Sequence, residues 1–191
     1  MNHFSVAELP LWQNGAVATL GHVAVGMALG RRYCRPYPIF SALAGSMLVF
    51  TTLSLLPDLD LIGYKLGITD GSPLSHRGAL HSLFAALLTA LATALIARIS
   101  GIEFKRTFNF AFLSMASHGL LDAITTGGKG VAFFWPWNND RFFLPWRPIP
   151  VAPIFLGLFT WHGAEILTLE LLWFSPLFLY ALWPRSRLWK N

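Results

Sequence analysis

Five long apolar stretches constrain the fold of this chain more than any other feature of its sequence. They cover residues 16–30, 37–56, 79–98, 108–126 and 153–183. Because a helix of about 20 apolar residues crosses a bilayer, each stretch is compatible with a bilayer-embedded helix. The first is short. The last is long enough to begin in the membrane interface, to tilt, or to break near Pro176.

The composition agrees with a membrane location. Of 191 residues, 54% are hydrophobic and 12% charged, and the mean hydropathy is +0.53, which is too apolar for an ordinary soluble domain of this size. We find no repeat, low-complexity tract or linker. We therefore predict one domain over residues 1–191, an all-α polytopic transmembrane bundle with about five membrane-embedded helices. The first 15 residues lack Lys and Arg, so we expect no signal peptide to be removed.

Cysteine and charge exclude several classes of site. The single cysteine, Cys34, excludes a disulfide framework or a Cys-based zinc site within one chain. The net charge of +5 comes from basic residues scattered among apolar segments rather than gathered on one polar face. We therefore predict no contact with nucleic acid.

The basic residues also predict an orientation in the membrane. The first loop, the third loop and the C-terminus are rich in Lys and Arg, so the positive-inside rule places them on the cytoplasmic side. The N-terminus and the two longest loops, 57–78 and 127–152, then face outward. The cytoplasmic group comprises Arg31, Arg32, Arg35, Arg98, Lys105, Arg106, Arg185, Arg187 and Lys190.

Histidines and aspartates recur at the outer ends of these stretches. This topology uses no information from the polar motifs, yet it places them all at one depth, which indicates one site for one or more divalent ions. Carboxylates and imidazoles beside long apolar runs need stabilisation, which a divalent cation provides. The expected ligands are His22, Asp58, Asp60, His76, His81, His118 and Asp122.

The spacing of these residues suggests how they bind. In an extended segment Asp58 and Asp60 project to the same side, toward one ion or one each toward a pair, unless they only cap a turn after Pro57. On a helix, His118 and Asp122 share a face and form a clamp; alternatively the imidazole makes a helix–helix hydrogen bond.

The segment around His76 leaves more alternatives open. Ser72-Pro73 predicts a helix start, which would set His76 and His81 about 140° apart. One then binds the metal while the other serves a neighbouring ion, or Gly78 bends the chain between them. Arg77 would hold a substrate phosphate or anchor to lipid headgroups.

The remaining polar residues are assigned by position. His22 lies among small residues and is either a ligand or a packing residue. Glu165, beside His162, is a ligand or general base, and Glu170 orients a ligating histidine. The aromatic loop at 133–147 predicts an interfacial belt, or the roof of a lipid-binding cleft.

These motifs resemble the YdjM-like family of LexA-binding, inner-membrane-associated, metal-dependent hydrolases of bacteria. The resemblance covers about residues 20–137 and rests on Gly21-His22, Leu56-Pro57-Asp58-Leu59-Asp60, His76-Arg77-Gly78 with His81-Ser82, Ser117-His118 with Asp122, and Trp135-Pro136. It implies a multi-pass protein of the bacterial inner membrane, a divalent metal and hydrolysis. LexA association is implied by the family alone. The chain departs from the family by carrying Leu80 where Thr is more usual.

The function predicted from these arguments is that of a membrane-bound, metal-dependent hydrolase acting on a lipid or lipid-linked phosphoester at the outer leaflet. The metal is zinc, or alternatively manganese. Its partners are membrane lipids and this substrate. The alternatives are a non-catalytic protein with a structural metal and a divalent-metal transporter. The predicted catalytic residues are Asp58, Asp60, His76, Arg77, His81, His118, Asp122 and Glu165.

Overall fold

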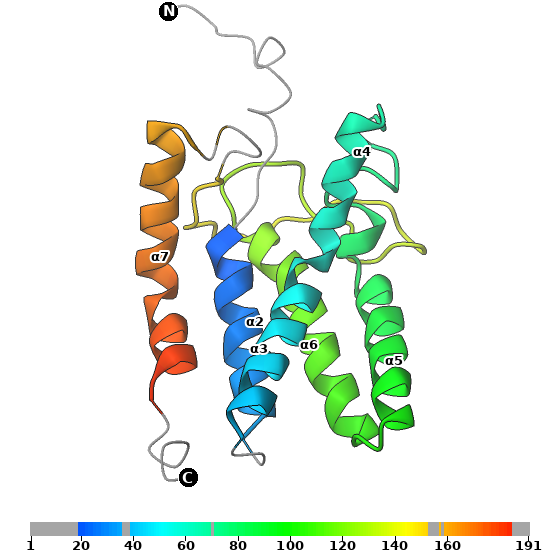
Figure 1. Ribbon diagram of the computed structural model, residues 1–191. Coiled ribbons are helices and arrows are strands. Elements are labelled where there is room, and N and C mark those ends of the chain that lie inside the picture. The colour runs from blue at the N-terminus through cyan, green and yellow to red at the C-terminus, as the bar shows by residue number, and fades with distance from the viewer. Residues whose placement is uncertain (1–18, 36–38, 70, 153–156, 158, 185–191) are drawn as a thin grey trace, which may run out of the picture.

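A computed structural model describes residues 19–35, 39–69, 71–152, 157 and 159–184. Its described part is all-helical, as predicted; two isolated bridges, Thr125 with Ile149 and Val131 with Phe142, are the extended pairings within it. The long helices run side by side (Figure 1). They are α2 (Thr19–Tyr33), α3 (Phe40–Leu55), α5 (Leu83–Ile99), α6 (Phe104–Ala123) and α7 (Trp161–Leu182).

Helix α2 is the centre of the bundle, in contact with α3, α6 and α7. Glycines allow these close approaches. A Cβ atom on Gly26 or Gly30 would collide with the α3 backbone, at Thr51 and Met47 respectively, and one on Gly21 would collide with the ring of Phe174 in α7. The small residues around His22 therefore do let other helices approach closely, as the sequence predicts.

An apolar layer fills the half of the bundle near the end of α2. Tyr33, Phe50, Leu53, Ala90 and Ala111 are buried together where α2, α3, α5 and α6 meet. The Tyr33 hydroxyl shares a 2.8 Å hydrogen bond with Thr107 Oγ1, so its polar atom is satisfied within this layer. The polar residues of the predicted site lie outside this layer, toward the opposite end of α2.

Two segments of the described chain are long and apolar enough to cross a membrane, rather than the five predicted. They are Phe40–Leu61, which includes α3, and Trp161–Leu182, which is α7. The other three long helices do not qualify as membrane spans, for separate reasons. Helices α2 and α5 have 15 and 17 residues, and α6 has 20 but carries Lys105, Arg106 and Asp122. Short length and charged side chains both reduce the apolar span.

Several boundaries differ from the predictions. Residues 72–78 form turns, so Ser72-Pro73 does not start a helix; α5 starts at Leu83, where the Ser82 hydroxyl accepts a 3.0 Å hydrogen bond from Ala85 N. Helix α7 continues through Pro176. Residues 16–18, 153–156 and 158, and the basic Arg185, Arg187 and Lys190, lie outside the described residues.

Candidate metal centre

The segment after α3 separates the two aspartates of the Pro57-Asp58-Leu59-Asp60 motif. It forms a 3-10 helix, η2 (Leu56–Leu61), followed by the short α4 (Ile62–Lys65). With three residues per turn, side chains two positions apart point about 120° away from each other. The predicted extended segment is therefore wrong, although Asp58 and Asp60 still each offer an oxygen to one group with His76 and His81. Asp58 also faces His118, with Oδ1 3.4 Å from Nε2.

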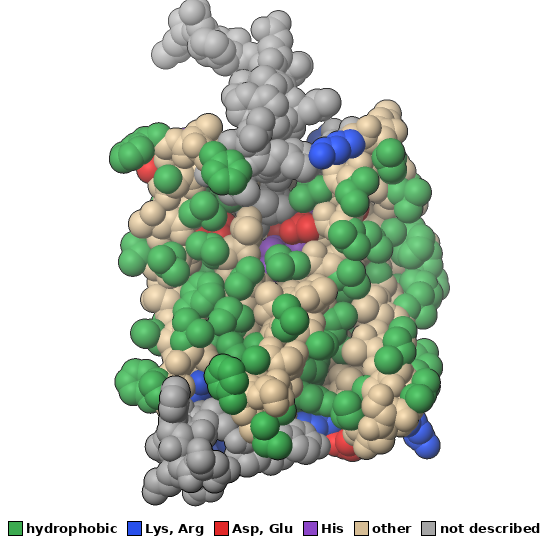
Figure 2. Space-filling model, viewed as in Figure 1, with side chains coloured by type: hydrophobic (Ala, Val, Ile, Leu, Met, Phe, Trp, Pro, Cys, Tyr) green, Lys and Arg blue, Asp and Glu red, His purple; other side chains and the backbone are tan. Residues whose placement is uncertain are grey.

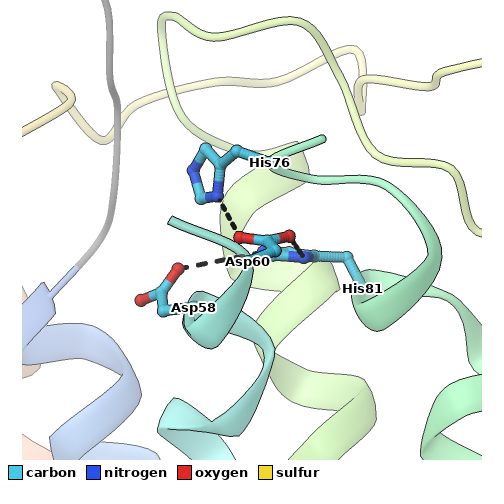
Figure 3. Close-up of side chains that lie close together, drawn as sticks. All are labelled: Asp58, Asp60, His76 and His81. Atoms are coloured by element: carbon cyan, nitrogen blue, oxygen red, sulfur yellow. Dashed lines mark hydrogen bonds and ion pairs between the residues drawn. The ribbon is translucent and has the colours of Figure 1, made fainter. Parts of the chain in front are cut away.

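Asp60 lies between two histidines and contacts both (Figure 3). Its Oδ1 lies 2.7 Å from His76 Nδ1, and its Oδ2 lies 3.1 Å from His81 Nδ1. The backbone N–H of Arg77 donates to Oδ2 at 3.2 Å. Gly78 makes this possible, because the chain bends there and a Cβ atom would collide with the carbonyl oxygens of Pro73 and Ser75. Of the sequence alternatives, the bend at Gly78 is confirmed.

Helix α6 brings His118 next to His81. His118 and Asp122 share a face, with His118 Nε2 3.0 Å from His81 Nε2 and Asp122 Oδ2 3.2 Å from the same nitrogen. His118 Nδ1 lies 2.6 Å from the carbonyl oxygen of Ser54. Because a carbonyl only accepts hydrogen bonds, Nδ1 carries the proton and Nε2 presents its lone pair to the cluster.

Helix α2 contributes His22 from the opposite side. Its ring stacks on that of His118, with centroids 3.6 Å apart and planes at 9°. His22 Nε2 lies 3.5 Å from Asp122 Oδ1. The side chain is fully buried, and neither ring nitrogen has a hydrogen-bond partner within the described part of the chain. A buried imidazole with two unsatisfied nitrogens is costly unless another group binds there.

Arg77 supports the cluster from behind. The residue has a left-handed backbone (φ 62°) and its side chain is buried. Its Nε lies 3.1 Å from Asp122 Oδ2, and its guanidinium donates to the Gly127 carbonyl at 2.9 Å and to Thr125 Oγ1 at 3.1 Å. An arginine buried in this way cannot anchor to lipid headgroups. Its N–H groups are directed at protein groups rather than at a substrate phosphate.

The acidic residues of α7 do not join the cluster. Glu165 and His162 are mostly exposed, at 57% and 71%, and lie 3.7 Å from each other. Glu170 is buried, but its Oε2 accepts a 2.7 Å hydrogen bond from the backbone N–H of Leu20. It therefore stabilises the first turn of α2, two residues before His22, instead of contacting a histidine.

The sequence analysis did not identify two groups that support the cluster. One is the Ser54 carbonyl behind His118. The other is Arg141, whose guanidinium donates to the His76 carbonyl at 2.9 Å and to Ser75 Oγ at 2.8 Å. A main-chain carbonyl has no sequence signature, and Arg141 is indistinguishable from an ordinary loop charge until the loops are placed.

The balance of charge in the cluster favours a bound cation. The cluster contains three carboxylates, from Asp58, Asp60 and Asp122, and one guanidinium, that of Arg77, which pairs with Asp122. Burial by itself lowers the pKa of both His76 and His81, but the carboxylates outweigh it: Asp60 raises the pKa of His76, and Asp122 with Asp60 raises the pKa of His81. The carboxylates therefore favour the protonated form of these two rings, and a bound metal would compete with those protons.

The donor atoms fit a divalent metal. Two groups place one ligand atom from each residue within 4.8 Å of the others: Asp58, Asp60, His76 and His81, and His22, His118 and Asp122. Asp58 Oδ1 and both oxygens of Asp122 are buried without a hydrogen-bond partner in the described residues. The two groups adjoin through His81 and His118, so all seven predicted ligands meet in one place.

Comparison with known proteins agrees with these motifs. The chain is 36% identical over 172 residues to the inner membrane protein YbcI of Escherichia coli (strain K12), in a match that covers 86% of this chain and 94% of that protein. No solved structure matches the chain. The family model described as YdjM inner membrane protein matches residues 17–188, nearly the whole sequence. The chain therefore belongs to the YdjM family of inner membrane proteins.

Proposed function

We propose that this protein is a metal-dependent hydrolase of the inner membrane that acts on a lipid or lipid-linked phosphoester. The observation that carries the proposal is the convergence of possible metal-ligand atoms from four separate elements. Two ligands of one ion with bonds of about 2.1 Å lie no more than about 4.2 Å apart. Six pairs of ligand atoms among five residues lie 3.0 to 3.9 Å apart; these residues are His22, Asp58, His81, His118 and Asp122.

The other residues orient these five. Asp60 holds His81 by Nδ1, so that Nε2 faces the remaining donors, and Ser54 does the same for His118. Mixed imidazole and carboxylate donors suit zinc, with manganese as the alternative. A bound divalent ion would polarise the phosphoester and lower the pKa of water enough to supply hydroxide near neutral pH.

We place the whole bundle in the membrane, with α2, α5 and α6 beside the two long apolar spans. Leucines exposed along α5 support this placement: Leu87, Leu88, Leu91 and Leu95 are 40–49% exposed. Figure 2 shows the visible His side chains and most of the acidic ones in the upper half of the molecule, and Lys and Arg mostly at the lower end. The positive-inside rule then directs the cluster and the N-terminus outward and the C-terminus to the cytoplasm.

The interior favours a hydrolase over a transporter. An ion path would need polar residues from the cluster to the opposite end. The layer around Tyr33, Phe50 and Ala111 is apolar instead. Asp58, with 18% of its side chain exposed, gives the cluster an opening to the outside that a closed structural site would not need.

The test is elemental analysis of detergent-purified protein, followed by hydrolysis of phospholipid and alkyl phosphoester substrates. We expect stoichiometric zinc or manganese, hydrolysis that a chelator abolishes, and recovery when the metal is returned. If the protein binds neither metal after reconstitution, the proposed hydrolase function is refuted. Protein that binds metal but hydrolyses nothing would support the structural-metal alternative.

Asp60→Asn tests the orienting role of this carboxylate. We expect metal affinity to fall about 10- to 100-fold, the usual effect of losing a carboxylate behind a ligating histidine. Asp140→Asn is the matched control, because Asp140 is exposed and bonds to Asn138. Competition with a chromophoric chelator measures both affinities, and equal values for the two variants would remove Asp60 from the site.

A further inference from the structure

An apolar groove with a volume of about 580 Å³ lies directly beside the cluster. Its lining comes partly from η2, α4 and the residue after α4, with Leu59, Ile62 and Leu66, and partly from later segments, with Leu74, Leu80 and Leu88. Several of these side chains are well exposed: Leu59 at 54%, Leu66 at 73% and Leu74 at 63%. Exposed leucines around one hollow form a site for an apolar ligand.

Asp60 is the point where the groove meets the cluster. It is the one ionisable side chain among the described residues that line the groove, and its carboxylate is the one that joins His76 and His81. The groove therefore meets the cluster at Asp60, and the rest of its lining is mostly apolar, with Ser75 and Thr89 as its other polar side chains. A ligand that matches it has a charged or polar head and an apolar body.

Aromatic side chains close part of this groove. Trp135 lines it, and the ring of Phe84 lies 6.0 Å from that of Trp135 and 5.3 Å from that of Trp137. Phe84 belongs to the first turn of α5, just after His81. The aromatic loop therefore packs against the start of α5, beside the cluster.

We propose that this groove binds a single alkyl or isoprenoid chain of the substrate, with its phosphoester directed at the cluster. This rests on the function proposed above and specifies its substrate as a long-chain amphiphile. The lining argues against a peptide, because backbone N–H and C=O groups would find almost no hydrogen-bond partners there. A small soluble phosphoester would leave the exposed leucines uncovered.

The test uses a long-chain alkyl phosphate with a diazirine at its tail, photolysed with the detergent-purified full chain and mapped by mass spectrometry. We expect labels to concentrate in residues 59–66 and 74–89. Labels spread evenly over the exposed faces of α3, α5 and α7 would show ordinary contact with surrounding lipid and overturn the proposal.

A pair of neighbouring leucines supplies matched variants. Leu88 lines the groove, whereas Leu87, one residue away and 43% exposed, does not. We expect Leu88→Trp to reduce groove labelling at least about fivefold and Leu87→Trp to leave it unchanged, since one introduced ring blocks the chain and the other faces away. Equal effects of the two substitutions would contradict the proposal.

The labelling result is independent of turnover. Phosphate-directed binding of the probe needs no hydrolysis, and the wild-type map depends on no variant. Groove labelling in a protein that hydrolyses nothing would support the chain-binding site and refute only the catalytic function. Hydrolysis with no labelling of the groove would refute the chain-binding site and leave the catalytic function in place.

Discussion

His118→Ala is expected to lower the affinity for the metal more than about 100-fold, because the substitution removes a ligand. Substitution of a residue that only orients a ligand lowers this affinity about 10- to 100-fold. His118 is fully buried, its Nε2 faces His81 at 3.0 Å, and its ring supports that of His22 by stacking. The substitution therefore deletes one donor and loosens a second. Elemental analysis of the purified variant measures the loss.

His162→Ala is the matched control. This histidine is 71% exposed on α7 and lies outside the cluster, so its removal should leave the metal content at the wild-type level. Size exclusion and circular dichroism check that both variants are folded. A folded His118→Ala protein with a full metal complement would contradict the site as described.

Arg77→Met is expected to lower the free energy of unfolding of the metal-free protein by about 3–5 kcal/mol, the usual cost of breaking a buried ion pair by removing one partner. The Asp122 carboxylate would remain buried without the guanidinium that lies 3.1 Å from it. Contacts from Arg77 to Thr125 and Gly127 would also be lost. Thermal unfolding in detergent measures the change.

Metal should partly rescue this variant, since a bound cation supplies positive charge to Asp122. Arg147→Met is the control, because Arg147 is exposed and lies over the ring of Phe143. A variant at position 77 that kept wild-type stability but lost hydrolysis would instead favour the phosphate contact predicted from the sequence.

The hydrophobic pattern predicted most of the secondary structure. Five apolar stretches became the five long helices, with boundaries displaced by up to eight residues. The i, i+4 spacing of His118 and Asp122 correctly placed both on one helix face. Helical periodicity is a local property, so it can be recognised without knowing which helices are neighbours.

Two of the wrong predictions concern short segments between the long helices. The direction of Asp58 and Asp60 depends on a 3-10 helix instead of an extended segment, and the position of His76 depends on turns after Ser72. The free-energy differences among such short conformations are small, so contacts with the rest of the molecule decide between them. Here Asp60 bonds to His76 and His81, both in a different segment.

The sequence by itself determined that the chain is helical, apolar and supplied with seven His and Asp side chains near one end of its helices. It also sufficed to indicate the family. Only the tertiary structure decided which of these side chains face one another, that Arg77 holds Asp122, that Glu165 lies outside, and that an apolar groove adjoins Asp60. The reason is physical. Helix formation follows local periodicity, whereas a site built from α2, η2, the 3-10 helix η3 (Ala79–His81) and α6 depends on how closely glycine-lined helices pack and how the turns between them bend.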